Sequence, residues 1–301
     1  MAYPNGVPTA AWKELFVAAQ SLGADSSGSS KPMSAEDRKF LEEAMSGLVK
    51  TSDPVRQMIQ LINDLKQINN PSEENIEKIE VIIDQLENIV CQIDCAVDFC
   101  KLGGMVEIKR FLGSKCNPAR IEAMRLLPTI LQNNPQAQEF ILKTDLLQIL
   151  FSLATAETEP SEIKIKALSA ISAAVRGHDQ GYSDFRRLNG FKTIISVFDS
   201  AVVAKDWSVA NKAAVTMVSI ANDLGYNSAL DHGLPTAIIT MYSKLPSNSS
   251  SSYLRDYISQ NMDLKKIDKD NGKLIIKGLE RDLEDERAAE EPDEVVLSLY
   301  S

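Results

Sequence analysis

The feature that most constrains this chain is a short turn motif that recurs four times along it. The turns align on Gly104, Asp145, Gly190 and Gly233, which lie 41, 45 and 43 residues apart. An apolar residue follows each turn and is expected to begin a short amphipathic helix, with the turn residue in a left-handed or helix-cap conformation. A period of this length indicates a repeat protein, in which each repeat is one supersecondary unit.

A longer helix with a constant apolar pattern is predicted upstream of each turn. Its apolar residues recur at i, i+3, i+4, i+7 and i+8, which places them on one face of an α-helix. The first copy keeps four of the five apolar positions. The four stripes are Ile82, Gln85, Leu86, Ile89 and Val90; Ala123, Leu126, Leu127, Ile130 and Leu131; Ala167, Ala170, Ile171, Ala174 and Val175; and Ala210, Ala213, Ala214, Met217 and Val218.

These two patterns predict an all-α fold. The expected architecture is an armadillo-like right-handed superhelical solenoid of about four repeats with helical caps, in which each unit buries its stripe only against its neighbours. Strand signals are nearly absent, since no sustained alternation of apolar and polar residues occurs. A compact helical bundle remains the alternative.

Four segments are expected along the chain. Residues 1–32 are a flexible N-terminal segment, because residues 25–32 are rich in Ser and Gly, and residues 33–78 are an N-terminal helical cap. Residues 79–245 hold the armadillo-like repeats. Residues 246–301 are a C-terminal helical cap with an acidic tail, in which Asn248 belongs to a Ser-rich loop. Outside the repeats, helices are predicted over residues 34–49, 54–69, 253–262 and 273–291, the last with Ile275, Ile276, Leu279 and Leu283 as its apolar side.

The charge distribution argues against several classes of partner. The chain has 32 Lys and Arg against 42 Asp and Glu, a net charge of −10, and nine of the carboxylates lie between Glu280 and Glu294. Nucleic acids and anionic membranes need a basic surface, and no basic run is present, so neither is expected as a partner. The sequence shows neither a signal-peptide pattern nor an apolar stretch of 18 residues. A cytoplasmic protein, acting as a monomer, is expected.

Neither a metal site nor a catalytic site is predicted. No phosphate-binding loop, nucleophile elbow or His-Glu-x-x-His motif is present, so the chain is not expected to be an enzyme. Of the two histidines, His178 is expected to interact with the last carbonyls of a helix and His232 to belong to a turn. The cysteines lack the Cys-x2-Cys spacing of zinc sites. We expect free, buried or half-buried thiols at all four of them, which are Cys91, Cys95, Cys100 and Cys116.

The predicted binding surface is the concave side of the solenoid, which the longest helix of each unit lines. Polar residues flanking the buried stripes form a row that is acidic at its start and basic or neutral later. Such a row suits a globular partner that carries both signs of charge. The partner-binding residues predicted from it are Asp84, Asn88, Arg125, Gln132, Asn133, Arg176 and Lys212, within a wider row that includes Glu87, Gln92, Thr129, Ser169, Ala173, Thr216 and Ser219.

Several blocks of sequence also resemble a known family. They are FLEEAMS at residues 40–46, AVDFCKLGGM at 96–105, QNNP at 132–135, KIKALSAIS at 164–172 followed by VR at 175–176, and RLNGF at 187–191. With these blocks, residues 33–198 resemble the heat-shock-chaperone-binding protein family of cytosolic nucleotide exchange factors. That family acts on seventy-kilodalton chaperones of the DnaK class. The block from Lys164 to Arg176 is the most specific part.

The resemblance implies a co-chaperone. In this family the concave face of an armadillo-like solenoid grips one lobe of the chaperone's ATPase domain, which opens the nucleotide cleft and releases ADP. The family has no catalytic residues and needs no cofactor. Asn133 and Arg176 are the preferred contact residues, because both lie in matched blocks and on the concave row.

The N-terminal segment is loosely similar to the family's substrate-release segment over residues 15–24. Its apolar residues share one helical face, and the linker that follows would tether them to the solenoid. A function in emptying the chaperone's substrate groove is therefore a hypothesis for residues 1–30. The apolar residues concerned are Trp12, Leu15, Phe16, Ala19 and Leu22.

An armadillo-type scaffold that binds an extended peptide is the alternative function. Such scaffolds repeat a Trp-x3-Asn pair on successive long helices, the Trp forming pockets and the Asn holding the peptide backbone. Here only Trp207 and Asn211 fit that spacing, once. The matched positions in the other units are Ile79, Arg120 and Lys164. One pair does not make the repeated ladder that peptide binding requires.

Overall fold

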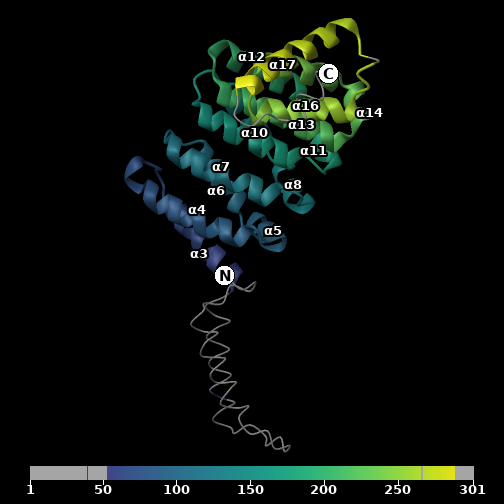
Figure 1. Cartoon of the computed structure of the whole chain (residues 1–301). Helices are drawn as coiled ribbons and strands as arrows, with labels where there is room; N and C mark the ends of the chain where they lie inside the picture. The colour runs from purple at the N-terminus through teal and green to yellow at the C-terminus, as the bar shows by residue number, and fades with distance from the viewer. Residues whose placement is uncertain (1–38, 40–52, 266, 289–301) are drawn as a thin grey trace, which may run out of the picture. The chain divides into compact units, whose positions relative to one another are not determined.

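The computed structural model describes Lys39, residues 53–265 and residues 267–288 (Figure 1). These residues form α-helices and one short 3-10 segment, η1, without a strand. The helices are α3 (Pro54–Gln67), η1 (Glu73–Asn75), α4 (Ile76–Val90), α5 (Ile93–Lys101), α6 (Gly104–Leu112), α7 (Asn117–Leu131), α8 (Pro135–Leu142), α9 (Leu146–Thr155), α10 (Ser161–Val175), α11 (Asp179–Arg187), α12 (Gly190–Ala204), α13 (Trp207–Leu224), α14 (Tyr226–Asp231), α15 (Leu234–Lys244), α16 (Ser249–Asn261) and α17 (Lys269–Ala288).

The chain divides into two units, Met1–Asn63 and Asp64–Ser301, and the boundary falls within α3. Of the first unit the structure describes Lys39, which is helical, and residues 53–63 at the start of α3. The predicted N-terminal segment, and the predicted helix over residues 34–49 apart from Lys39, lie outside the described residues. The four predicted segment boundaries stay a prediction.

The second unit is built from stacked rows of helices (Figure 1). The long helices pack in sequence order, α4 on α7, α7 on α10, α10 on α13 and α13 on α16. A second row joins α5, α8 and α11, and a third joins α9, α12, α15 and α17. Each unit thus buries its apolar face against its neighbours, which is the arrangement of an armadillo-like solenoid. The predicted all-α solenoid is confirmed.

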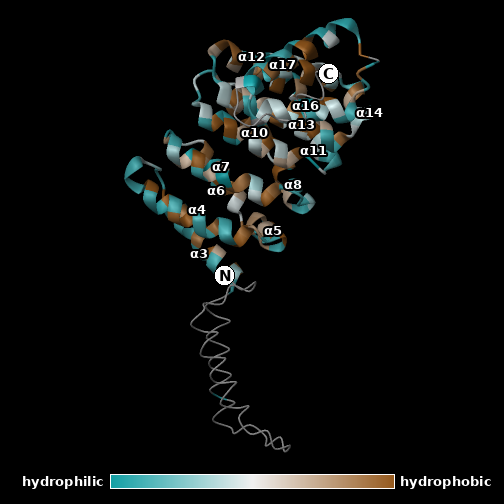
Figure 2. Ribbon diagram, in the orientation of Figure 1, coloured by the Kyte–Doolittle hydropathy of each residue, from teal (hydrophilic) through white to brown (hydrophobic). Residues whose placement is uncertain are grey.

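The predicted apolar stripes form the contacts between the long helices. All fifteen stripe residues of α7, α10 and α13 have exposed fractions of 1% or less. In α4 the four apolar members are buried, while Gln85 is exposed. Figure 2 shows hydrophobic and hydrophilic residues alternating along the helices. The position of each stripe in the sequence therefore predicts correctly which face of the helix packs against the neighbouring repeats.

The turns differ from the prediction by one residue in two repeats. Gly103 and Asn189, with φ of 87° and 56°, adopt the left-handed conformation, whereas Gly104 and Gly190 are the first helical residues of α6 and α12. Gly233 is left-handed as expected, and Asp145, with a φ of −85°, is the N-cap residue of α9, which the prediction also allowed. The two helical glycines are needed for space instead. An added Cβ would lie within 2.4 Å of the ring of Phe99 or Phe185, respectively.

This close approach gives a stability prediction. Gly190→Ala should lower the free energy of unfolding by about 1–3 kcal/mol, because the new methyl group would force the buried ring of Phe185 aside. Gly272→Ala in α17 is the matched control, since no atom lies within 4 Å of its added Cβ. There alanine should stabilise the helix by about 0.5–1 kcal/mol. Urea unfolding followed by circular dichroism measures both, and equal effects would contradict the steric explanation.

The ends of several helices are tied by side chains from neighbouring layers. Arg110 donates to the carbonyl oxygens of Leu65 and Ile68 at 2.7 and 2.8 Å, at the C-terminal end of α3. Gln138 donates to the carbonyl oxygens of Ala173 and Arg176, each at 2.8 Å, where α10 ends. The last carbonyls of a helix have no partner within the helix, so these contacts satisfy them and fix one layer on the next.

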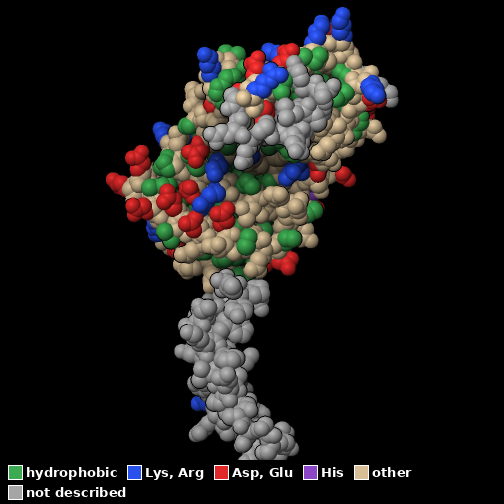
Figure 3. All heavy atoms as spheres, in the orientation of Figure 1, with side chains coloured by type: hydrophobic (Ala, Val, Ile, Leu, Met, Phe, Trp, Pro, Cys, Tyr) green, Lys and Arg blue, Asp and Glu red, His purple; other side chains and the backbone are tan. Residues whose placement is uncertain are grey.

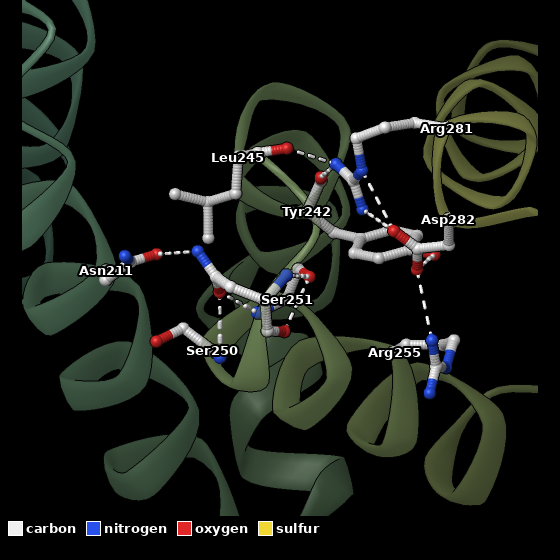
Figure 4. Close-up of polar contacts among 9 residues, drawn as sticks. Asn211, Tyr242, Leu245, Ser250, Ser251, Arg255, Arg281 and Asp282 are labelled. Atoms are coloured by element: carbon white, nitrogen blue, oxygen red, sulfur yellow. Dashed lines mark hydrogen bonds and ion pairs between the residues drawn. The ribbon is translucent and has the colours of Figure 1, made fainter. Parts of the chain in front are cut away.

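A buried polar network fixes the C-terminal helix on α15 and α16 (Figure 4). Asp282, 1% exposed, accepts hydrogen bonds from the Tyr242 hydroxyl at 2.6 Å and from Arg255 Nη1 at 3.1 Å. Arg281 contacts its other oxygen and also donates to the Tyr242 carbonyl at 2.8 Å. Burial and the hydrogen bond to Asp282 raise the pKa of Tyr242, so its hydroxyl remains a donor. Each buried charge in this network therefore has an opposite charge in contact.

Three local predictions for this region were wrong. Asn248 is not in an open loop, because its side chain accepts hydrogen bonds from the Ser250 and Ser251 amides and caps α16, which begins before the expected residue 253. Helix α17 begins at Lys269 rather than residue 273. Ile276 is 55% exposed, whereas the other three residues of the predicted apolar side are buried. A stripe of three residues is sufficient to seat α17.

The cysteines are free thiols, but not all are sheltered. Cys95 and Cys100 are buried and Cys116 is half-buried, as predicted. Cys91 is exposed, so the prediction was wrong there, because it caps the C-terminal end of α4 and lies beyond the buried stripe. Burial raises the pKa of the Cys100 thiol to about 12, which keeps it protonated at neutral pH.

No described helix is both long and apolar enough to cross a bilayer.

Candidate partner-binding surface

The row of long helices begins with an acidic cluster that surrounds one arginine. Arg125 on α7 is bonded to Asp84 on α4, and it lies 3.7 Å from Glu87 and 3.1 Å from Glu122. Thr129 adds a hydrogen bond to Glu87 at 3.2 Å. Burial raises the pKa of Glu122, which Arg125 only partly offsets. The positive charge of Arg125 is therefore neutralised within the protein, and the surface around it stays acidic.

The basic half of the row lies on α10 and α13. Lys166 and Lys212 are half-buried, and Arg176 caps the C-terminal end of α10. Burial lowers the pKa of Lys212, and the positive charges of Arg176 and Lys166 lower it further. The Arg176 Nε is buried and has no hydrogen-bond partner among the described residues. We call Lys166, Arg176 and Lys212 the basic cluster; no ion pair within the described part of the chain joins them to an acid, although Lys166 lowers the pKa of Glu122 and Asp223 accepts a hydrogen bond from the Gly177 amide next to Arg176.

The two clusters lie on successive helices of the same row. Figure 3 shows acidic side chains crowded over α4 and the adjoining part of α7, with Lys and Arg side chains beside them. The predicted change from acidic to basic along the row is therefore present. Unpaired and partly desolvated charge is stabilised when an oppositely charged partner covers it, so the basic cluster is the strongest candidate contact in this row.

The predicted site residues fall into three groups. The structure joins Asp84 to Arg125 by an ion pair, and the positive charges of Arg176 and Lys166 lower the pKa of Lys212 after the larger effect of burial. Asn88, Gln132 and Asn133 are exposed. In the wider row the prediction was wrong for two residues, because Ala173 and Thr216 are 5% and 2% exposed. The small residues on α10 and α13 let these helices approach closely, which covers both positions.

The QNNP block is a helix connection. Gln132 caps the end of α7, Asn133 has a φ of 55°, and the Asn134 side chain caps α8 by accepting a hydrogen bond from the Ala137 amide at 3.3 Å. A left-handed φ is uncommon outside glycine but is tolerated by asparagine. The identity of Asn133 thus has a backbone explanation, besides any contact with a partner.

The next repeat makes the same connection with Arg176, Gly177 and His178. Gly177 has a φ of 68°, and the His178 Nδ1 accepts a hydrogen bond from the Gly181 amide at 3.0 Å. The prediction that His178 interacts with the last carbonyls of a helix was therefore wrong. It caps the start of α11, because its ring nitrogen satisfies an amide that the helix leaves free. His232 does lie at a turn, where its ring stacks on Phe191 at 5.4 Å.

Sequence reasoning missed Glu122 and Lys166. Each directly precedes the first stripe residue of its helix, Ala123 and Ala167, so the two occupy the same place in successive repeats. One step before a buried residue on a helix turns the side chain about 100° from the stripe, toward its edge. Counting from the stripe backwards as well as forwards would have found both.

The position of Lys212 in the basic cluster predicts that its charge lowers the stability of the fold. Lys212→Met should raise the free energy of unfolding at pH 7 by about 0.5–1 kcal/mol, since it removes the cost of burying the ammonium group and the repulsion from Arg176 and Lys166. The folded state lowers the pKa of Lys212 below its ordinary value of 10.5, so the unfolded chain binds the extra proton there. Wild-type stability should accordingly rise relative to Lys212→Met as the pH approaches that value.

Lys192→Met on α12 is the control for this experiment, because Lys192 is exposed and outside the basic cluster. Thermal unfolding of the three proteins between pH 7 and pH 10 gives the comparison. If Lys212→Met were less stable than the wild type at pH 7 by as much as a core substitution, the packing of the lysine side chain would outweigh the cost of its buried charge.

The single Trp-x3-Asn pair of the alternative function is partly used within the fold. Trp207 is 37% exposed at the start of α13. Asn211 Oδ1 accepts a hydrogen bond from Asn248 Nδ2 at 3.2 Å, which ties α13 to the start of α16. The side-chain oxygen of Asn211 therefore takes part in the contact between α13 and α16.

Comparison of the sequence with curated proteins shows relatives over about half of the chain. Hsp70-binding protein 1 of Rattus norvegicus is 32% identical over 184 residues, which covers 57% of this chain and 50% of the relative. The Hsp70 nucleotide exchange factor FES1 of Debaryomyces hansenii is 30% identical over 162 residues, 52% of this chain and 53% of the relative. Over these stretches the chain is similar to Hsp70-binding protein 1 and to FES1. The predicted resemblance is confirmed, and the chain spans about half the length of the curated relatives it matches.

Solved structures agree on the fold. Two engineered proteins superimpose with TM-scores of 0.50 and 0.54 at 17% and 15% identity, covering 74% and 75% of this chain and 96% and 89% of theirs. At that identity the likeness concerns the arrangement of helices alone. No protein-family model matches the chain.

Proposed function

We propose that this chain is a nucleotide exchange factor for a seventy-kilodalton heat-shock chaperone. The observation that carries the proposal is its relationship to proteins named for binding Hsp70 or exchanging its nucleotide. The row of long helices is the proposed surface for that function, with an acidic cluster on α4 and α7 and the basic cluster on α10 and α13. Binding through this surface to the ATPase domain, in the cytoplasm and as a monomer, completes the proposal.

The mechanism requires no catalytic residue and no cofactor. Exchange is accelerated if the solenoid binds the open, nucleotide-free ATPase domain more tightly than the closed ADP-bound form. By linkage, nucleotide must then weaken the binding of this protein by the same factor, with a coupling free energy on the order of 1–3 kcal/mol. Of the predicted site residues, Arg176 and Lys212 are the proposed direct contacts, while Asp84 and Arg125 hold the acidic cluster in place.

Release of fluorescently labelled ADP from a cytosolic seventy-kilodalton chaperone tests the function. The full chain should accelerate release at substoichiometric concentration, and calorimetry should show tighter binding to the nucleotide-free ATPase domain than to its ADP complex. Unchanged release together with equal affinity for the two states would refute the exchange function.

The N-terminal residues suggest a second step for the same proposal. If residues 1–30 compete for the chaperone's substrate groove, tethering gives this weak ligand a high effective concentration once the solenoid is bound. Deleting residues 1–30 should then leave ADP release intact and slow the displacement of a bound substrate peptide. Peptide displacement at the full-length rate would show that the segment has no part in release.

A further inference from the structure

The peptide group between Arg176 and Gly177 is hydrogen-bonded at both of its polar ends. The carbonyl oxygen of Arg176 accepts a hydrogen bond from Gln138 Nε2 on α8 at 2.8 Å. The N–H of Gly177 donates one to Asp223 Oδ2 on α13, also at 2.8 Å. These partners lie 38 residues before Arg176 and 46 residues after Gly177, respectively. Two helices that are distant in the sequence therefore hold one peptide group.

A peptide group held in this way has a fixed orientation. It is planar, and because it is trans its C=O and N–H bonds point in opposite directions. The amide of Arg176 is also bonded, to the Ser172 carbonyl at 3.2 Å, where α10 ends. Both peptide groups that flank the Arg176 Cα thus have hydrogen-bond partners. The direction in which the Arg176 side chain leaves the backbone is therefore set by the fold.

The equivalent peptide group at the end of α7 lacks these contacts. Gln132 and Asn133 form the same connection, and Asn133 is left-handed as Gly177 is. Among the described residues, no hydrogen bond reaches the carbonyl oxygen of Gln132 or the amide of Asn133. Fixing the peptide group is consequently a property of the turn that carries Arg176 and not of every such connection.

The difference between the two turns follows from the length of α13. Helices α7 and α10 end at the last residues of their stripes, Leu131 and Val175. Helix α13 continues past its last stripe residue, Val218, to Leu224, and Asp223 lies on this extension. The extension brings an acceptor to the Gly177 amide, whereas α10 has no extension that could reach the connection at the end of α7.

The stability of α13 alone does not account for an acid at this place. Asp223 is the last residue but one of the helix, where a carboxylate is unfavourable beside the negative end of the helix dipole. Its side chain is exposed and forms no ion pair within the described part of the chain. What Asp223 does contribute is the hydrogen bond to Gly177, directly after Arg176.

We propose that Gln138 and Asp223 are positioning residues that hold Arg176 in the orientation in which it binds the partner. The two side chains fix the backbone, and Arg176 makes the contact. The binding part of this inference rests on the proposed function, whereas the fixed turn does not. A side chain on an ordered backbone loses less conformational freedom on binding, so loss of either hydrogen bond should weaken the complex.

Hydrogen exchange of the Gly177 amide tests the fixed turn without any partner. In the full chain, Asp223→Ala should speed this exchange about tenfold or more, because the amide loses its acceptor. Asp223→Asn keeps an oxygen at the same place and should restore most of the protection. Asp231→Ala, which removes the same charge from an exposed position on α14, is the control. Exchange as slow in Asp223→Ala as in the wild type would overturn the proposal.

Calorimetry with the nucleotide-free ATPase domain of the chaperone tests the effect on binding. Asp223→Ala should weaken binding about three- to tenfold, and Asp223→Asn should recover most of the affinity. In an Arg176→Ala background, Asp223→Ala should cause no further loss, because its effect is transmitted through Arg176. Gln138→Met, which removes the other hydrogen bond, should behave like Asp223→Ala in both backgrounds. Asp231→Ala should leave the affinity unchanged.

The possible outcomes separate positioning from other roles of Asp223. Equal affinity of the wild type and Asp223→Ala would overturn the positioning role. So would an equal loss with and without Arg176, which indicates a general structural effect, or an equal loss in Asp223→Asn, which indicates that the carboxylate itself contacts the partner. If the full chain does not bind the chaperone while Gly177 exchange changes as expected, the proposed function fails and the fixed turn is supported.

Discussion

Reversing the charge of Arg176 is expected to reduce affinity for the chaperone's ATPase domain by about 30-fold or more and to slow ADP release accordingly. Removing one member of a desolvated charge pair at an interface costs about 2–5 kcal/mol, and a like charge in its place adds repulsion. The fold should tolerate the change, because Arg176 caps the end of α10 and its Nε has no hydrogen-bond partner among the described residues. Calorimetry and labelled-ADP release measure the two effects.

Lys192→Glu is the control for Arg176→Glu, since it makes the same charge change on an exposed residue of α12. Asn133 needs a different substitution, because its φ of 55° makes alanine strained there. Asn133→Gly keeps the backbone conformation and removes only the side chain. Full exchange activity in Arg176→Glu, with loss in Lys192→Glu, would mean that the chaperone binds the row of α9, α12 and α15 rather than the row of long helices.

Replacing Asp282 with alanine is expected to destabilise the C-terminal part of the solenoid by about 3–5 kcal/mol. Asp282 is 1% exposed and contacts Arg255, itself 5% exposed, at 3.1 Å. Removing one partner of a buried ion pair leaves the other charge in a low-dielectric environment, and this penalty is larger than the net stabilisation by the intact pair. Tyr242→Phe should cost only about 1 kcal/mol, because it removes one hydrogen bond and leaves both arginines paired with Asp282.

Hydrogen exchange locates the effect of Asp282→Ala. Amides of α17 and α15 should lose protection first, while those of α7 and α10 keep it, because repeat proteins are stabilised largely by nearest-neighbour contacts. Asp285→Ala, an exposed position on the same helix, should change stability by about 0.5 kcal/mol or less. A loss of less than 1 kcal/mol in Asp282→Ala would contradict the assignment of this network as the anchor of α17.

Knowledge of the repeat period makes some tertiary contacts predictable from the sequence. Arg125 and Asp84 are 41 residues apart, Asn134 donates to the carbonyl of Ile93 across 41, and Arg110 reaches Leu65 across 45. Each separation is close to one repeat, because stacked units bring equivalent positions side by side. An alignment of the polar residues by repeat, like that of the apolar stripes, pairs Asp84 with Arg125 from the sequence alone.

The helices, their period and the buried stripes all follow from the order of the amino acids. Those features depend on a 3.6-residue periodicity and on self-similarity, both of which are local in the chain. The change of charge along the row of long helices follows in the same way, because stacking places equivalent positions of successive long helices side by side.

Which of these charges are available to a partner depends on the packing of the layers. Arg125 lies on α7 and Arg176 at the end of α10, yet Arg125 is surrounded by Asp84, Glu87 and Glu122, whereas the Arg176 Nε has no hydrogen-bond partner among the described residues. Likewise, Gly190 has the sequence context of a turn residue, but the ring of Phe185 packs directly against it. Neutralisation and close packing depend on distances between neighbouring layers. Periodicity shows which layers meet, but the size and rotamer of each side chain set how near they come.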